Sequence, residues 1–264
     1  MDPLRVMTFN VRLDTADDGD DAWPNRRDLV ADTIRYHAPD VIGLQEPFAH
    51  QLDYLEEALP GYEWVGESRL ATDGEGEHAP IGVRTDRFSL VDSETFWLSE
   101  TPDEPGSRGW DGNHPRVATW TRLDDATAER PLVHVNTHLD NRGEVARREG
   151  AALVAERVRE LADGTTPVVT GDLNCLAGEP AHARLDGLDL GDGRQLEPAA
   201  ETATFRHGPE TTRTDFHELD PGRKMDHVFV PSDCSVTGYA ALTDRDDTRY
   251  PSDHLPVVAD VVRR

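Results

Sequence analysis

The chain has 264 residues, of which 36% are hydrophobic, and this is sufficient for one large hydrophobic core. Its 52 acidic residues against 27 Lys plus Arg give a formal net charge of −25, which disfavours binding to a long polyanion such as extended nucleic acid. The chain has no apolar run of about eighteen residues and no basic N-terminal stretch followed by an apolar one, so we expect neither a membrane span nor a secretory signal.

The composition favours a protein that works in concentrated salt. Lys224 is the only lysine, and at molar salt the Debye length falls to about 3 Å, which screens the mutual repulsion of so many carboxylates. We therefore expect a cytoplasmic protein of a halophile, with a haloarchaeon as the source; an acidic mesophilic protein is the alternative. The two cysteines, Cys175 and Cys234, lack the spacing of a zinc site, and we expect Cys175 to be a small buried side chain.

The N-terminal part alternates strands and helices. Apolar residues at every second position predict a strand over 4–11, and apolar residues at helical spacing predict a helix over 25–37. The apolar run over 40–46, bounded by prolines, predicts a buried strand, and a second helix is expected over 49–59.

From residue 62 onward, short alternating runs separated by Gly, Pro, Asp and Asn predict antiparallel strands. The longest helical pattern covers 144–162, and a strand is expected directly after it over 166–174. The other strands are expected over 62–68, 81–84, 87–91, 116–123, 131–139, 225–230, 236–242 and 255–262. Loops are expected over 71–80, 99–114 and 176–224, the last with a short helix near 180–186.

These elements form two β-rich halves, each with helices, without a compositional break or an internal repeat. We therefore expect a single domain over 1–264 of the α/β class. The predicted architecture is a four-layer α/β/β/α sandwich, in which two mixed or antiparallel sheets pack face to face with the helices outside.

Polar residues that can bind a ligand stand at the ends of the first two predicted strands. Asn10 ends the first strand and Glu46 ends the second, so both side chains are expected at the same edge of the sheet. A turn-capping role for Asn10 and a solvated carboxylate for Glu46 are the plain alternatives.

The strand over 131–139 has an unusual polar face. His134, Asn136 and His138 alternate with apolar residues, and a buried polar row needs partners or a ligand. We expect His138, at the end of the strand, to be functional, and His134 to be a structural histidine with hydrogen-bond partners.

Acids and one further histidine recur where later strands meet loops. Asp172 and Asn174 follow an apolar run and fall on the same side of their strand, although an Asx turn would explain them equally well. Asp226 opens one strand, and Asp253 and His254 directly precede the last one. By strand parity His227 points away from Asp226, so a zinc site that uses both is unfavourable.

Positive residues gather near these motifs, which indicates a positively charged region around the site on an otherwise acidic surface. They are Arg142, Arg147, Arg148, Arg213, Arg223, Lys224, Arg245 and Arg249.

Taken in order, the motifs TFN, QE, NTHLD, GDLN, MDHVF and SDH resemble the endonuclease/exonuclease/phosphatase superfamily, over residues 5–258. That superfamily includes DNase I-like nucleases, inositol-polyphosphate phosphatases and deadenylases. The stretches WPNRRDLV and TFWLSETPDEPGSRGWDGNHPRVATW resemble a microbial branch described only as metal-dependent hydrolases.

The resemblance implies a role for each matching residue. Glu46 would be the main metal ligand with Asn10 beside it, and Asp253 a further acid of the metal site. Asp172 would orient or deprotonate the attacking water, and Asp226 would orient His254, which stabilises charge developing on phosphorus.

The resemblance also implies contacts to the phosphate. Asn174 and His138 would hold phosphate oxygens, and Arg116 and Asn136 are further expected substrate contacts. Some relatives have an acid where this chain has Arg12, so we expect Arg12 to meet phosphate instead. The carboxylate partner that some nucleases give the first histidine cannot be located in the sequence.

We therefore expect a Mg²⁺- or Mn²⁺-dependent hydrolase of a phosphodiester or phosphomonoester, because hard oxygen ligands suit these ions and phosphoryl transfer requires neutralised oxygens. The expected substrate is a phosphorylated small molecule or a short nucleic acid, with no membrane and no obligate protein partner. The alternatives are a nuclease, a non-catalytic phosphate-binding protein of the same fold, and a zinc hydrolase that uses His207, His217 and His227.

Overall fold

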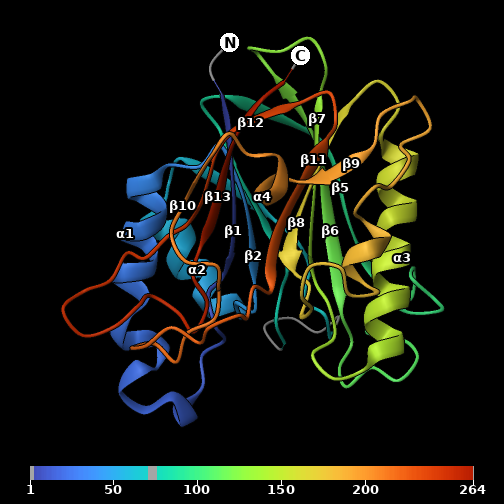
Figure 1. Ribbon diagram of the computed structural model, residues 1–264. Helices are drawn as coiled ribbons and strands as arrows, with labels where there is room; N and C mark the ends of the chain where they lie inside the picture. The colour runs from blue at the N-terminus through green and yellow to red at the C-terminus, as the bar shows by residue number, and fades with distance from the viewer. Residues whose placement is uncertain (1–2, 71–75, 264) are drawn as a thin grey trace.

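Two sheets form the centre of the computed structural model, which describes residues 3–70 and 76–263 (Figure 1). Within these ranges the first sheet has seven strands in the order β10 (Phe205–His207), β12 (Ser235–Ala241), β13 (Val257–Val262), β1 (Leu4–Asn10), β2 (Val41–Gln45), β4 (Ile81–Arg84) and β3 (Tyr62–Val65). β1 pairs with β2 in parallel and with β13 antiparallel, so the sheet is mixed.

The second sheet has six strands in the same described ranges, in the order β5 (Phe88–Trp97), β6 (Val117–Asp125), β7 (Leu132–His138), β8 (Thr166–Asp172), β11 (Asp226–Pro231) and β9 (Leu196–Pro198). β7 and β8 are parallel, with His138 opposite Asp172. β11 runs antiparallel to β8 and places Asp226 opposite Asp172. This register brings two acids and one histidine to one edge of the sheet.

Helices cover the outer faces of both sheets (Figure 1). α1 (Arg27–His37) and α2 (Ala49–Ala58) lie on the first sheet, and α3 (Glu144–Leu161) lies on the second. The short elements η1 (Ala16–Asp21), η2 (Trp23–Asn25), η3 (His182–Arg184) and α4 (Ala199–Thr202) lie in the connections. The predicted four-layer sandwich is therefore confirmed. Within the described residues, none of the helices has the length and apolar character needed to span a bilayer.

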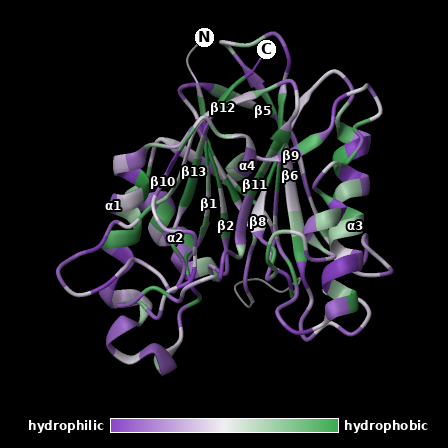
Figure 2. Ribbon diagram, viewed as in Figure 1, coloured by the Kyte–Doolittle hydropathy of each residue, from purple (hydrophilic) through white to green (hydrophobic). Residues whose placement is uncertain are grey.

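The hydrophobic core has three main layers, and Figure 2 shows hydrophobic residues along the strands and hydrophilic ones in the long connections. Between the sheets, Val6 and Val41 pack in one cluster with Leu132, Val168 and Val228. The period-two alternation of the strands makes this inner layer possible, because it directs every second side chain to the same face. Burial of these side chains supplies the main favourable term in folding.

The predicted long elements are found within a few residues of their expected bounds, but the region 176–224 was only partly predicted. It contains η3 at the expected short helix, and also β9, α4 and β10, which the sequence did not reveal. Elements of three or four residues are too short to show a periodic pattern. The strand expected over 87–91 continues to Trp97, and residues 71–75 of the predicted loop lie outside the described residues.

A buried polar network joins the two sheets. Asn136 on β7 donates from Nδ2 to the carbonyl oxygens of Leu44 at 2.7 Å and Pro80 at 3.0 Å, and its Oδ1 accepts from Gln45 Nε2 at 2.7 Å. Gly43 on β2 allows this approach, since a Cβ there would lie 2.3 Å from Asn136 Oδ1. The network fixes β2 against β7 and so sets how the two sheet edges meet.

His134 extends the network from the second sheet. Its Nε2 lies 2.8 Å from Thr170 Oγ1, whose hydroxyl donates to Asn136 Oδ1 at 3.1 Å, so Nε2 carries the ring proton. Its Nδ1 is buried and has no hydrogen-bond partner in residues 3–70 and 76–263. His134 is thus structural as expected, although only one of its ring nitrogens has a partner.

Burial lowers the pKa of His134 to about 3 from its ordinary 6.5. Between these values the unfolded chain binds a proton that the folded protein excludes, so stability falls as the pH falls. His134→Gln should weaken this dependence by up to about 1.4 kcal/mol per pH unit between pH 6.5 and 5, measured by urea unfolding. His207→Gln is the matched control because His207 is exposed; equal pH slopes for the wild type and His134→Gln would contradict the assignment.

Candidate active site

The acids and histidines expected from the sequence meet where the ends of β1 and β2 face the ends of β7 and β8. The Asn10 side chain makes hydrogen bonds to three groups at this edge. Its Nδ2 donates to Glu46 Oε1 and to Asp172 Oδ2, both at 3.0 Å, and its Oδ1 accepts from the Arg12 amide at 3.0 Å. One amide therefore connects a carboxylate of the first sheet with a carboxylate of the second.

Three residues at this edge have a left-handed backbone. Arg12 has φ 58°, Glu46 has φ 75° and Asn174 has φ 48°. Side chains other than glycine adopt this region rarely, and such strain concentrates at functional sites because surrounding contacts must maintain it. Here the Glu46 carboxylate is held by the Asn10 amide and by the Leu13 amide, which donates to Oε2 at 3.0 Å.

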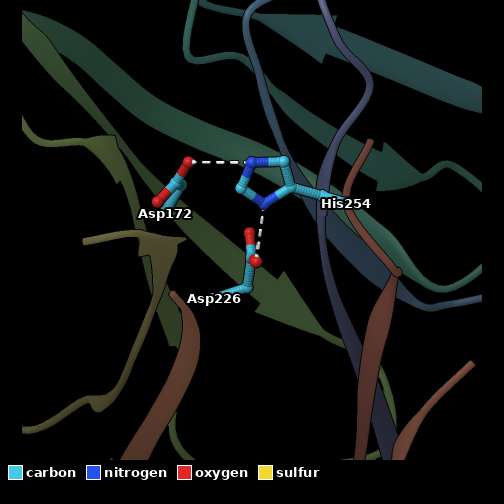
Figure 3. A group of neighbouring side chains, drawn as sticks. All are labelled: Asp172, Asp226 and His254. Atoms are coloured by element: carbon cyan, nitrogen blue, oxygen red, sulfur yellow. Dashed lines mark hydrogen bonds and ion pairs between the residues drawn. The ribbon is translucent and has the colours of Figure 1, made fainter. Parts of the chain in front are cut away.

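An aspartate-histidine pair forms the centre of the site (Figure 3). His254 Nδ1 lies 2.8 Å from Asp226 Oδ2, and His254 Nε2 lies 3.6 Å from Asp172 Oδ2. All three side chains are buried. Although burial alone would lower it, the carboxylates of Asp226 and Asp172 raise the pKa of His254 to about 9. Burial, together with the nearby Asp226 charge, raises the pKa of Asp172 to about 6.

These three groups are also close enough to share a cation, since ligand atoms of Asp172, Asp226 and His254 lie within 4.8 Å of one another. However, the 2.8 Å from His254 Nδ1 to Asp226 Oδ2 is the length of a direct hydrogen bond and leaves no room for an ion between them. We interpret Asp226 and His254 as a hydrogen-bonded pair, as the sequence predicted.

Asp253 lies on the other side of His254. Its Oδ2 is 3.0 Å from Arg213 Nη1. Although burial alone would raise it, the positive charges of His254, Arg213 and Arg12 lower the pKa of Asp253, so this acid is ionised. The Ser252 hydroxyl donates to Asn10 O at 2.7 Å and ties this segment to the end of β1.

His138 and Asn174 form the second-sheet side of the site. His138 Nε2 lies 3.0 Å from Asn174 Nδ2 and 3.5 Å from Asp172 Oδ2. Arg116 Nη1 lies 2.9 Å from the other ring nitrogen, Nδ1. Burial and the charge of Arg116 hold the pKa of His138 well below its ordinary value.

Glu77 is a site residue that the sequence did not reveal. Its Oε2 lies 2.8 Å from Arg69 Nη1, 3.2 Å from Arg116 Nη1 and 3.8 Å from His138 Nδ1. It thus lies beside the Nδ1 side of the first histidine, and Arg116 Nη1 contacts both groups. Glu77 lies in a stretch predicted as loop, without a periodic pattern that would have marked it.

The structure changes the interpretation of three expected substrate contacts. Arg116 is buried and bound to His138 and Glu77, so it positions a site residue. Arg12 donates from Nε and Nη2 to the Asp18 carboxylate, at 3.0 and 2.9 Å. Asn136 does not fit a substrate contact, because it is fully buried between the sheets and its amide is used there. Period two assigned Asn136 to the polar face correctly but could not show that this face is interior.

The three histidines of the zinc alternative do not come together. His207 is exposed on β10, His217 Nε2 lies 3.0 Å from Asp21 Oδ2, and His227 Nε2 lies 3.0 Å from Cys175 O. Cys175 is buried in the second-sheet core as expected, and within the described residues neither cysteine forms a disulfide.

Two mixed sheets packed face to face, with an aspartate-histidine pair and clustered carboxylates at one edge, define the DNase I-like class of fold. The sequence matches the Endonuclease/Exonuclease/phosphatase family over residues 7–254, and the chain belongs to this family.

Solved structures share the fold over the whole chain. A family protein from Bacteroides vulgatus is 32% identical, with a TM-score of 0.92 and 100% of both chains covered. A mannosyl-6-phosphatase from Bacteroides thetaiotaomicron is 34% identical, with a TM-score of 0.90 and 98% of this chain and 99% of that one covered.

A comparison of sequences adds a further relative. Nocturnin from Xenopus laevis is 26% identical over 295 residues, and the match covers 97% of this chain and 72% of the relative.

The buried Glu77 carboxylate makes a testable contribution to stability. Glu77→Gln would leave the guanidinium groups of Arg69 and Arg116 facing a neutral amide. Because removal of one partner from a buried ion pair leaves uncompensated charge, the free energy of unfolding should fall by about 3 kcal/mol. Chemical unfolding measures this, with Glu67→Gln as control because Glu67 is exposed. A change as small as that of the control would show that Glu77 does not hold the two arginines.

Proposed function

We propose that this protein is a divalent-metal-dependent phosphoesterase that hydrolyses its substrate by in-line attack of water. The main support is the buried Asp226–His254 pair, in which Asp226 Oδ2 lies 2.8 Å from His254 Nδ1. Asp172 Oδ2 lies 3.6 Å from the other ring nitrogen, Nε2. Phosphoryl transfer needs oriented water and donors at developing charge, and this arrangement offers a carboxylate for the water and an imidazole for the phosphate.

In the proposed reaction, Asp172 accepts a proton from water as its oxygen bonds to phosphorus. The bond from phosphorus to the leaving oxygen breaks, and that oxygen takes a proton from solvent, which gives an alcohol and a phosphate; Asp172 then releases the proton of the attacking water to solvent. His254, oriented by Asp226, donates to a phosphate oxygen. The raised pKa of Asp172, about 6, suits a group that must accept a proton near neutral pH.

His138 and Asn174 complete the proposed phosphate site. His138 Nε2 lies 3.5 Å from Asp172 Oδ2, and Arg116 Nη1 contacts the other ring nitrogen. The Asn174 amide lies 3.0 Å from the same Nε2, so both side chains face one small region beside the proposed nucleophile.

The donor set fits Mg²⁺ or Mn²⁺. Glu46, Asp253 and Asn10 supply hard oxygen atoms, which these ions prefer. The buried Asp226 Oδ1 has no hydrogen-bond partner among the described residues, and burial together with the Asp226 charge raises the pKa of Asp172, so the site carries negative charge that a cation would neutralise. A bound ion would neutralise charge on the phosphate oxygens.

Similarity supports a small phosphorylated substrate. The mannosyl-6-phosphatase is 34% identical to this chain and nearly the same length, and the net charge of −25 disfavours long nucleic acids. We propose a sugar phosphate or a similar small phosphoester, in the cytoplasm of a halophile. The candidate catalytic residues Asp172, Asn174 and His254 are all present, which weighs against a non-catalytic binding protein.

Removal of metal tests the proposal directly. After treatment with a chelator, release of inorganic phosphate from mannose 6-phosphate and from p-nitrophenyl phosphate in concentrated KCl should stop, and Mg²⁺ or Mn²⁺ should restore it. Glu46→Gln should raise the metal concentration needed for half-maximal rate, because it removes a charged oxygen ligand. Full activity in metal-free buffer would exclude this mechanism.

A double-mutant cycle tests the Asp226–His254 pair. His254→Ala and Asp226→Asn should each lower kcat by about two orders of magnitude or more, the scale for loss of one preorganised donor. The double variant should be scarcely slower than His254→Ala, because members of one network are non-additive. His207→Ala, an exposed histidine, is the control. If the two losses multiply in the double variant, Asp226 and His254 act independently.

A further inference from the structure

Arg213 lies beside the site although it belongs to none of the six motifs. Its backbone forms an isolated antiparallel bridge with His254, in the segment between β10 and β11. The Thr214 amide donates to Asp253 O at 2.8 Å, and the Leu255 amide donates to Thr212 O at 2.7 Å. These bonds hold the Arg213 backbone against the segment that carries Asp253 and His254.

The Arg213 side chain points at the proposed reaction centre. Its Nη1 contacts both Asp253 Oδ2, at 3.0 Å, and His254 Nε2. Its Nη2 makes no hydrogen bond to the described part of the chain, and 29% of the side chain is exposed. A ligand from solvent can therefore reach this guanidinium, while Arg12 is bound by Asp18 and Arg116 is buried against His138 and Glu77.

The positive charge of Arg213 acts on His138 as well as on His254. The Arg213 charge contributes to lowering the pKa of His138, which places the guanidinium within electrostatic reach of that ring. Arg213 Nη1 and His254 Nε2 are direct neighbours. A phosphate oxygen in front of this pair would accept from both groups.

Building on the proposed function, we propose that Arg213 binds the phosphate of the substrate and makes the site selective for phosphomonoesters over phosphodiesters. A guanidinium forms short, paired hydrogen bonds with phosphate oxygens. A monoester above pH 7 carries nearly two negative charges, since its second pKa is about 6, whereas a diester carries one. Coulomb attraction grows with the charge of the ligand, so the cation favours the monoester.

Arg213→Gln tests the proposal, with Arg223→Gln as the matched control. Both changes remove one positive charge from the same segment, but Arg223 is half exposed, and the nearest oxygen of its acidic partner, Asp220, is 3.7 Å away. The substrates are p-nitrophenyl phosphate and bis(p-nitrophenyl) phosphate at pH 8 with Mg²⁺. Circular dichroism and thermal unfolding confirm that each variant folds.

For the monoester, kcat/KM should fall by about tenfold to a hundredfold in Arg213→Gln, the scale for a hydrogen bond to a charged group, and much less for the diester. Arg213→Lys should recover part of the preference because it restores the charge, and Arg223→Gln should change neither rate. Equal losses on both substrates, or no loss, would overturn the proposal.

Binding of inorganic phosphate, measured by calorimetry, separates this proposal from the proposed function. Arg213→Gln should weaken phosphate binding about tenfold or more, whereas Arg223→Gln should not. If the wild type binds phosphate but hydrolyses neither substrate, the proposed function fails while the contact of Arg213 with phosphate stands. Unchanged phosphate binding in Arg213→Gln refutes the contact whether or not the protein is an enzyme.

Discussion

The site depends on the two hydrogen bonds that the Asn10 amide donates to Glu46 and Asp172. Glu46 and Asp172 come from different sheets and carry like charge, and their carboxylates would repel each other in a buried edge. Asn10 Nδ2 donates to both at 3.0 Å. Because one amide bonds to both acids, their separation is fixed by a planar group on a buried strand, and the remaining site residues are arranged around that fixed pair.

The network between the sheets makes this geometry possible. Gly43 lets Asn136 reach across to the Leu44 carbonyl and to the Gln45 side chain, which locks β2 against β7. A buried polar group that loses its hydrogen-bond partner costs free energy, so a shift of one sheet against the other would be unfavourable. The network therefore sets the match between the edge that carries Glu46 and the edge that carries His138.

Buried arginines organise the rest of the site in a protein whose surface is strongly acidic. Arg26 is only 1% exposed and donates to the backbone carbonyls of Val11, Arg12 and Pro251, which ties the loop after β1 to the segment before β13. Arg116 Nη1 contacts both His138 Nδ1 and Glu77 Oε2. A guanidinium can fill both roles because it offers five donors in a fixed plane.

The sequence by itself determined the long elements, the layered fold and the residues Asn10, Glu46, His138, Asp172, Asn174, Asp226, Asp253 and His254, which the structure brings to one edge. It could do so because side-chain periodicity and strand ends are local properties of the chain. Only the tertiary structure shows which side chains contact these site residues. Glu77 meets His138 from 61 positions earlier in the chain, through Arg116, and Arg213 reaches His254 from 41 positions earlier. The alternation of a strand shows which residues share a face, but only the packing of the two sheets shows what that face contacts. For this reason the sequence could not show that Asn136 lies in the interior.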